Sequence, residues 1–393
     1  YEVTFSEDRA EIVRRDGAIG TTLQVIVSPE DDAEVRRVSL TNLGTKGREI
    51  ELTSYAEVVL APPAVDAAHP AFSNLSVETE CVPELDTLLA RRRPRAHGEA
   101  PVWLAHVAVV EGDPVGELQW ETDRARFLGR GRGIRTPAAV IDGRPLSNTS
   151  GAVLDPIVSL RRRVRLPPGD TVRATFSTLV APSRAEALDL AEKYHDPATF
   201  DRAATLAWTQ AQVQQHHLGM GPDEAHLFQS LASRVLYSDR SLRSPAEILA
   251  RQTEGPAALW AHRISGDLPI VLVRIDDSED VGIVRQLLRA HEYWRMKQLA
   301  VDLVILNEHA PSYAQDLQAL LETLVRTSQS AGPHNGHESH GNVYIVRADR
   351  LSATQRDVLR SVARAVLSSR HGTLAEQVAR AQRPDAAAPL VLP

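Results

Sequence analysis

Apolar and polar residues alternate with a period of two over most of residues 1–180, which is the pattern of half-buried strands. In residues 50–60, for example, Leu52 and its even-numbered neighbours share one face, and Glu51 lies on the other. Residues 35–42 precede this segment across the turn-like sequence NLGTKG, which predicts a hairpin between the two. The repeated alternation predicts an antiparallel β-sandwich over residues 1–181.

The hydrophobic period changes to that of helices after Pro182. Ser183 and Glu186 form a capping-box pattern, so we expect a helix to begin there. Further amphipathic segments follow, and Gly219 is expected to end the second helix. Ser244 is expected to cap a short fourth helix. We interpret residues 182–258 as a helical linker.

The last third of the chain alternates strongly apolar segments with amphipathic helices. The apolar segments are residues 269–275, 301–308 and 342–349. This order predicts a parallel sheet covered on both faces by helices, a Rossmann-like three-layer α/β domain over residues 259–382. Residues 383–393 are rich in proline and alanine and are predicted to be a linker tail. The fold class is therefore α+β, with several domains.

Composition narrows the function classes. The chain has 393 residues, a net charge of −7 and one cysteine, Cys81. The negative charge argues against nucleic-acid binding, and a single cysteine excludes an intrachain disulfide. No apolar run is long enough to cross a bilayer. The chain lacks an initiator methionine and begins within a predicted strand, so we expect a piece of a longer protein.

Exposed aromatic side chains would indicate sugar binding, because sugar rings stack their C–H faces on aromatic rings. Aromatic residues make up only 5 % of the chain. His69, Phe72 and Asn74 fall in a predicted loop and are our first candidates for ligand contacts. Trp103 and Trp120 fall in the predicted sandwich and are further candidates. Core packing is the alternative for each aromatic ring.

A second candidate site lies where the predicted parallel strands end. Asp276, Asp277, Asn307 and Glu308 follow the first two strands, and ligands of open α/β sheets bind at this edge. Asp277 is also a candidate N-cap of the next helix. The chain has no P-loop or nucleophile elbow, and the sequence predicts no cofactor.

Three histidines and a carboxylate cluster in a glycine-rich segment. These residue types can bind a divalent metal, but the polar surroundings favour a solvated loop, and we predict no metal site. The residues are His334, His337, Glu338 and His340.

Several long segments resemble the cyclic β-1,2-glucan synthases, bacterial glycosyltransferases that also carry a phosphorylase module. They include EVRRVSLTNLG, REIELTSYAEVVLAPPAVDAAHPAFSNLSVETE, SLRRRVRLPPGDT and SGDLPIVLVRI. More distantly, the first half is similar to the β-supersandwich of the family 94 glycoside phosphorylases (formerly glycosyltransferase family 36). This resemblance implies a galactose-mutarotase-like sandwich.

The resemblance also implies a role. In this family the phosphorylase acid and the membrane-embedded transferase would lie outside the chain, so no catalytic residue is assigned. It implies a non-catalytic region that binds or orients a β-1,2-glucan oligosaccharide and contacts neighbouring domains of the same polypeptide. The segment itself would not touch the membrane, and its anchored parent would place it at the cytoplasmic face of the inner membrane.

Two other functions remain open at the level of sequence. The first is a purely structural interdomain module. The second is a fragment of a family 94 phosphorylase, which would need two carboxyl groups across a pocket. No motif in the sequence pairs any two of the carboxylates that could serve this purpose. These carboxylates are Glu57, Glu78, Glu80 and Asp155.

Overall fold

A computed structural model describes residues 1–94, 98–237, 239–251, 254–310, 316–330 and 341–382. The chain divides into two compact units, residues 1–212 (unit 1) and 213–393 (unit 2). The boundary falls inside helix α6 (Ala198–Leu218), so the helices of the predicted linker are shared between the units. The predicted tail, 383–393, lies outside the described residues.

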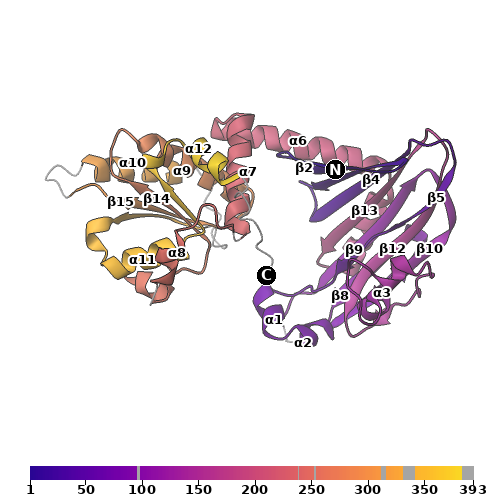
Figure 1. Ribbon diagram of the computed structural model, residues 1–393. Coiled ribbons are helices and arrows are strands. Elements are labelled where there is room, and N and C mark those ends of the chain that lie inside the picture. Colours follow the sequence, from indigo (N-terminus) through magenta and orange to yellow (C-terminus); the bar gives the residue numbers. More distant parts are fainter. Residues whose placement is uncertain (95–97, 238, 252–253, 311–315, 331–340, 383–393) are drawn as a thin grey trace, which may run out of the picture. The chain divides into compact units, whose positions relative to one another are not determined.

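Unit 1 is built from two antiparallel sheets (Figure 1). The larger sheet has nine strands within the described residues, in the order β1-β2-β3-β4-β13-β9-β8-β7-β11. Their bounds are β1 Glu2–Phe5, β2 Arg9–Asp16, β3 Ile19–Val27, β4 Ala33–Asn42, β13 Thr171–Ala181, β9 Val102–Glu111, β8 Thr87–Arg92, β7 Val77–Val82 and β11 Gly151–Ala152. The smaller sheet pairs β12 (Pro156–Leu166) with β10 (Asp113–Asp123), β5 (Arg48–Thr53) and β6 (Ala56–Glu57).

The alternation of β9 explains how the large sheet is covered on both faces. Leu104 and Ala108 point into the sandwich, where they pack with Leu160 of β12. Val107 points to the opposite face and packs with Ala187 of helix α5 (Arg184–His195). The antiparallel sandwich predicted from the period-two pattern is therefore confirmed.

The other helices of unit 1 are short: α1 Pro63–Ala68, α2 Pro70–Asn74, α3 Arg124–Leu128 and α4 Ala138–Ile141.

The predicted hairpin around NLGTKG is wrong. Strand β4 pairs with β3 and β13, whereas β5 pairs with β12 in the other sheet. The cause is the fully buried Asn42, whose Nδ2 donates to the Lys46 carbonyl at 2.8 Å and to the Leu166 carbonyl at 3.1 Å. These bonds turn the chain from one sheet into the other.

Unit 2 contains a parallel sheet in the order β16-β15-β14-β17. Its strands are β14 Ile270–Ile275, β15 Asp302–Asn307, β16 Val343–Arg347 and β17 Ala365–Ser368. One face is covered by α7 (Pro222–Leu236), α9 (Val281–Met296), α10 (Asp316–Ser330) and α12 (Leu374–Gln382). The other is covered by α11 (Ala353–Val362) and the 3-10 helix η2 (Pro256–His262). Helices therefore lie on both faces of the parallel sheet. Strand β17 was not predicted, because it is only four residues long.

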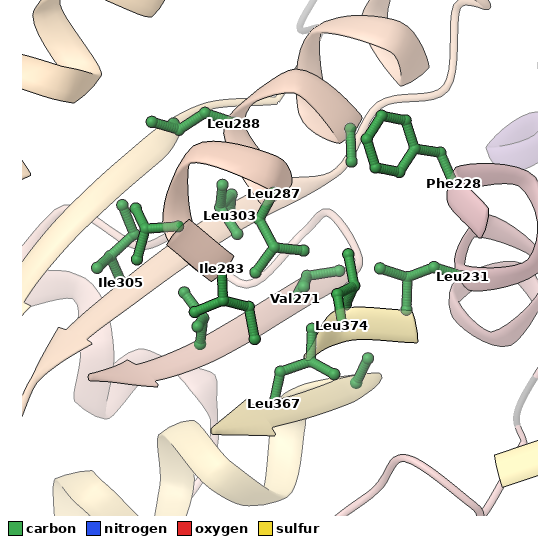
Figure 2. Packing of buried hydrophobic residues seen from close by; sticks show 14 of the residues in the cluster. Phe228, Leu231, Val271, Ile283, Leu287, Leu288, Leu303, Ile305, Leu367 and Leu374 are labelled. Carbon is green, nitrogen blue, oxygen red and sulfur yellow. The ribbon is translucent and has the colours of Figure 1, made fainter. Parts of the chain in front are cut away.

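The core of unit 2 lies between the sheet and the larger group of helices. Figure 2 shows Ile283 and Leu287 of α9 meeting Val271 and Leu367 of the strands, with Leu231 of α7 at the border. All of these side chains are buried. Apolar residues at helical spacing on α7 and α9 account for this packing.

Helix caps were predicted with mixed success. Ser183 caps α5 as expected, accepting a hydrogen bond from the Glu186 amide at 3.2 Å. Asp277 is not the cap of α9, which begins after Asp280. Ser244 does not cap α8 (Ala246–Ala250), because its hydroxyl donates to the Arg360 carbonyl at 2.9 Å. In that case tertiary contacts displaced the local capping preference.

Candidate functional site

The segment predicted as a loop around Phe72 forms two short helices, α1 and α2. A proline stands in the first turn of each, at Pro63 and Pro70, where its fixed φ suits a helix start. The Phe72 side chain is 63 % exposed, and the His69 ring meets it edge-on with centroids 6.2 Å apart. An exposed aromatic ring on an ordered helix is a platform that a sugar ring can stack on.

A buried arginine fixes α2 to the large sheet. Arg92 of β8 is 6 % exposed. Its Nη1 donates to the Ser73 carbonyl at 3.2 Å, to the Ser73 hydroxyl at 3.0 Å and to the Val59 carbonyl at 3.4 Å. Because Ser73 is fully buried and adjacent to Phe72, these bonds hold the backbone that presents the exposed ring.

A polar network continues from α2 across the surface of unit 1. Asn74 Nδ2 donates to Asp155 Oδ1 at 3.2 Å, and Arg124 Nη1 donates to Asp155 Oδ2 at 3.2 Å. Arg124 Nε donates to Glu57 Oε1 at 2.9 Å, and the Tyr55 hydroxyl donates to the same oxygen at 2.8 Å. Planar amide, carboxylate and guanidinium groups beside an aromatic ring can hydrogen-bond the hydroxyl groups of a sugar.

The electrostatics of the network do not favour acid catalysis. The hydrogen bond from the Tyr55 hydroxyl lowers the pKa of Glu57, and Arg124 lowers it further. A general acid at neutral pH needs a raised pKa instead. No sequence motif pairs Glu57 with Asp155, yet the structure brings both to Arg124.

The other two carboxylates considered for catalysis also have arginine partners. Glu78 lies 2.7 Å from Arg91 and 3.3 Å from Arg93, and Glu80 pairs with Arg184. The hydrogen bond from Arg184 lowers the pKa of Glu80, and Glu78 is engaged in ion pairs with its two arginines.

The two tryptophans named as candidates take part in packing. Trp103 is half-buried on the α5 face of the large sheet, with the Arg91 guanidinium carbon 5.6 Å from its ring. Trp120 is half-buried against the cluster inside the sandwich. They belong to packing clusters on opposite faces of the large sheet, so a role for both in one ligand site stays a prediction.

At the carboxyl edge of the parallel sheet, Asp276 is occupied by an arginine. Arg370 Nε donates to Asp276 Oδ2 at 2.6 Å, and this contact lowers the pKa of Asp276. Asp277 lies beside it and accepts a bond from the Glu279 amide at 2.9 Å. The Ser369 hydroxyl also donates to Asp276, at 3.3 Å.

Glu308 and Asn307 at the same edge are also engaged. Glu308 accepts two bonds of 2.9 Å from Arg274 and one of 3.3 Å from Arg360. Asn307 is buried and donates to Gln318 Oε1 at 3.1 Å. The structure therefore brings the predicted residues to one edge, where Asp276 and Glu308 contact arginines of the same unit.

The histidine-rich segment with His334, His337, Glu338 and His340 lies outside the described residues. Across the residues that are described, no group of histidine, cysteine and carboxylate side chains has the arrangement of a metal site. No helix in the described ranges is long and apolar enough to cross a membrane.

Residues 1–197 match the family model of the glycosyl hydrolase 94 supersandwich domain. The chain belongs to this family. Cyclic beta-(1,2)-glucan synthase of Rhizobium meliloti (strain 1021) is 42 % identical over 378 residues, which are 96 % of this chain and 13 % of the synthase. Solabiose phosphorylase of Paenibacillus borealis is 29 % identical over 163 residues, 42 % of this chain and 20 % of that enzyme. The family 94 chain thus spans a small part of each relative.

Solved structures resemble the chain only weakly. The match to a bacterial glucoamylase complexed with acarbose covers 53 % of this chain and 27 % of the glucoamylase chain, with 10 % identity and a TM-score of 0.32. The match to a polysaccharide lyase covers 46 % of this chain and 23 % of the lyase chain, with 14 % identity and a TM-score of 0.29. The assignment to family 94 rests on the sequence match to the supersandwich.

Sequence reasoning missed Tyr55 and Arg124 as members of the site. Tyr55 follows an alternating strand, and Arg124 opens α3 almost seventy positions later in the chain. Neither lies in a motif of its own. Only the pairing of β12 with β6 and β10 brings their segments together.

Proposed function

We propose that unit 1 binds and orients a β-1,2-glucan chain, as a non-catalytic region of a larger glucan-synthesising enzyme. The observation that carries this proposal is the exposed ring of Phe72 on a helix fixed by Arg92, beside the network of Asn74, Asp155 and Arg124. The curated relative named as a cyclic glucan synthase supports the choice of glucan. The lowered pKa of Glu57 supports binding rather than hydrolysis.

The setting of this region is part of the same proposal. We infer a parent that transfers glucose to β-1,2-glucan and trims it by phosphorolysis, anchored so that this region faces the cytoplasm at the inner membrane. The sandwich of residues 1–181 would be of the galactose-mutarotase type. Residues 182–258 would connect it to a Rossmann-like domain of residues 259–382, which would contact neighbouring domains of the polypeptide.

Isothermal titration calorimetry of the purified chain with linear and cyclic β-1,2-glucans tests the proposal, with cellooligosaccharides as the linkage control. Phe72→Ala removes the platform. Phe5→Ala is a matched control, because Phe5 is also in unit 1 and is 65 % exposed, close to the 63 % of Phe72. We expect saturable binding selective for the β-1,2 linkage, weakened about tenfold by Phe72→Ala and unchanged by Phe5→Ala.

The possible outcomes separate the functions. Absence of heat up to millimolar glucan would overturn glycan binding and leave a structural interdomain module. Equal weakening by both phenylalanine variants would show that binding does not use the α2 platform. Release of sugar phosphate from glucan and inorganic phosphate by the isolated chain would instead favour a phosphorylase fragment.

A further inference from the structure

Unit 2 contains a cavity of about 890 Å³ with an unusual lining. It lies among the end of α7, the segment 239–248, strands β14 and β17, and helices α11 and α12. Six arginines contribute to its wall: Arg234, Arg240, Arg243, Arg274, Arg360 and Arg380. Pockets that bind small molecules commonly have volumes of roughly 300–1,000 Å³.

The positive charge of this wall is only partly neutralised. Glu308 pairs with Arg274 and Arg360, and Asp239 pairs with Arg234. Arg240, Arg243 and Arg380 have no carboxylate partner among the residues that the structure describes. In a chain with a net charge of −7, this local excess of cations favours an anionic ligand.

Part of the wall is held in place by bonds to backbone groups. Arg243 Nη2 donates to the Ser361 carbonyl at 2.8 Å, and the Ser244 hydroxyl donates to the Arg360 carbonyl at 2.9 Å. The Val366 amide of β17 donates to the Leu242 carbonyl at 2.7 Å. These bonds attach segment 239–248 to α11 and to the outer strand, so the backbone that carries Arg240 and Arg243 is held in position.

Two of the arginines keep an unused donor. The Nε atoms of Arg243 and Arg360 are buried, and neither has an acceptor within the described part of the chain. Buried polar atoms are nearly always hydrogen-bonded, so such exceptions need an explanation. These Nε atoms are not accessible from the cavity, so the donors available to an anion there are the Nη groups of the wall arginines.

The position of the cavity agrees with a general rule for parallel sheets. The chain leaves β14 through α9 on one face and reaches β17 through α11 on the other, so the winding reverses between these neighbouring strands. Ligands of open α/β sheets bind beside the carboxyl ends of the strands at such a point. The cavity includes Arg274 near the end of β14 and His371 just after β17.

We propose that this cavity binds a small phosphate ester, with Arg240, Arg243 and Arg380 contacting the phosphate group. The guanidinium fork matches the geometry of phosphate oxygens and binds them with two bonds. Three arginines without a carboxylate partner fit a group with about two negative charges, as phosphates carry near neutral pH. The volume leaves room for the organic part of the ester. This ligand is separate from the glucan proposed for unit 1.

Calorimetric titration of the full chain at constant ionic strength tests this proposal. The probes are ribose 5-phosphate, ADP and inorganic phosphate, with ribose as the uncharged control. The test variant is Arg240→Gln with Arg380→Gln, because both side chains are exposed and line the cavity. The control is Arg285→Gln with Arg356→Gln, which removes the same charge from exposed positions of unit 2 outside the cavity wall.

We expect saturable binding of ribose 5-phosphate or ADP that weakens at least about tenfold in the test variant and stays unchanged in the control. Equal weakening in both variants would overturn the proposal by showing non-specific charge attraction. Inorganic phosphate that binds as tightly as both esters would overturn the ester assignment. Phosphorus NMR of each probe with the unaltered chain gives a second test that needs no variant, and unperturbed ester signals at millimolar concentration would refute binding.

Discussion

Burial of His106 is expected to make the stability of unit 1 depend on pH. His106 lies on β9 inside the sandwich and is 4 % exposed. Its ring nitrogens lie 2.8 Å from the Ser54 hydroxyl and 3.0 Å from the Thr178 hydroxyl, and Phe176 stacks on the ring. Burial lowers its pKa from 6.5 to about 4, and the positive charge of Arg36 contributes in the same direction.

The sign and size of the effect follow from linkage. Between pH 6.5 and pH 4 the unfolded chain protonates this histidine while the folded chain keeps it neutral, so protons favour unfolding and stability is lost as pH falls. Each unit of pKa difference corresponds to about 1.4 kcal/mol. Lowering the pH from 7.5 to 5.0 therefore removes about 2 kcal/mol of unfolding free energy through His106 alone.

Comparison with His106→Gln isolates this contribution from that of other titrating groups. Glutamine keeps a donor and an acceptor but does not titrate, so its own loss of stability between pH 7.5 and 5.0 should be about 2 kcal/mol smaller. His69→Gln is the control, because His69 is an exposed histidine of the same unit. Urea unfolding followed by hydrogen exchange of β9 and β13 reports on unit 1 separately. An identical pH dependence in the native chain and His106→Gln would refute the reasoning.

Three further outcomes are expected. Leu231→Ala removes a fully buried side chain from the core of unit 2 and should cost roughly 3 kcal/mol in urea unfolding, whereas a cost below about 1 kcal/mol would contradict the packing. Ser352→Ala removes the bond of 3.1 Å from the Gln355 amide at the start of α11, and should cost about 1 kcal/mol by the same assay; an unchanged midpoint would argue against the cap. Burial raises the pKa of the Cys81 thiol from 9.0 to about 11, so a thiol reagent at pH 8 should label it about 100-fold more slowly than in urea. Equal labelling rates with and without urea would be inconsistent with that burial.

Local periodicity determined most of the elements. Strands β5 and β9 show period-two alternation, and helices α7 and α9 show helical spacing. Each pattern reflects which side chains the element buries, so it can be recognised from consecutive residues. Two cases fell outside this rule. The four residues of β17 are too few to show a period, and the segment of α1 and α2 was interpreted as a loop because its prolines also suit turns.

The pairing of strands depended on tertiary contacts. The turn after β4 has the composition of a hairpin, yet Asn42 bonds to Leu166 more than a hundred positions away and sends the chain into the other sheet. A side chain bonded across the sandwich leaves no signal in the residues next to it. For the same reason the sequence predicted that β5 exists but not that β12 is its partner.

In both candidate sites, some residues were identified from the sequence and others were brought together only by the fold. The sequence alone identified Phe72 as a candidate platform and Asp276 and Glu308 as residues at a strand edge. Only the fold placed Arg124 between Glu57 and Asp155 and gathered arginines from residues 234–380 around one cavity. Interactions between charged side chains depend on their distance in space, and the order of residues along the chain does not show that distance. Their chemistry is therefore decided when the sheets close and bring distant segments together.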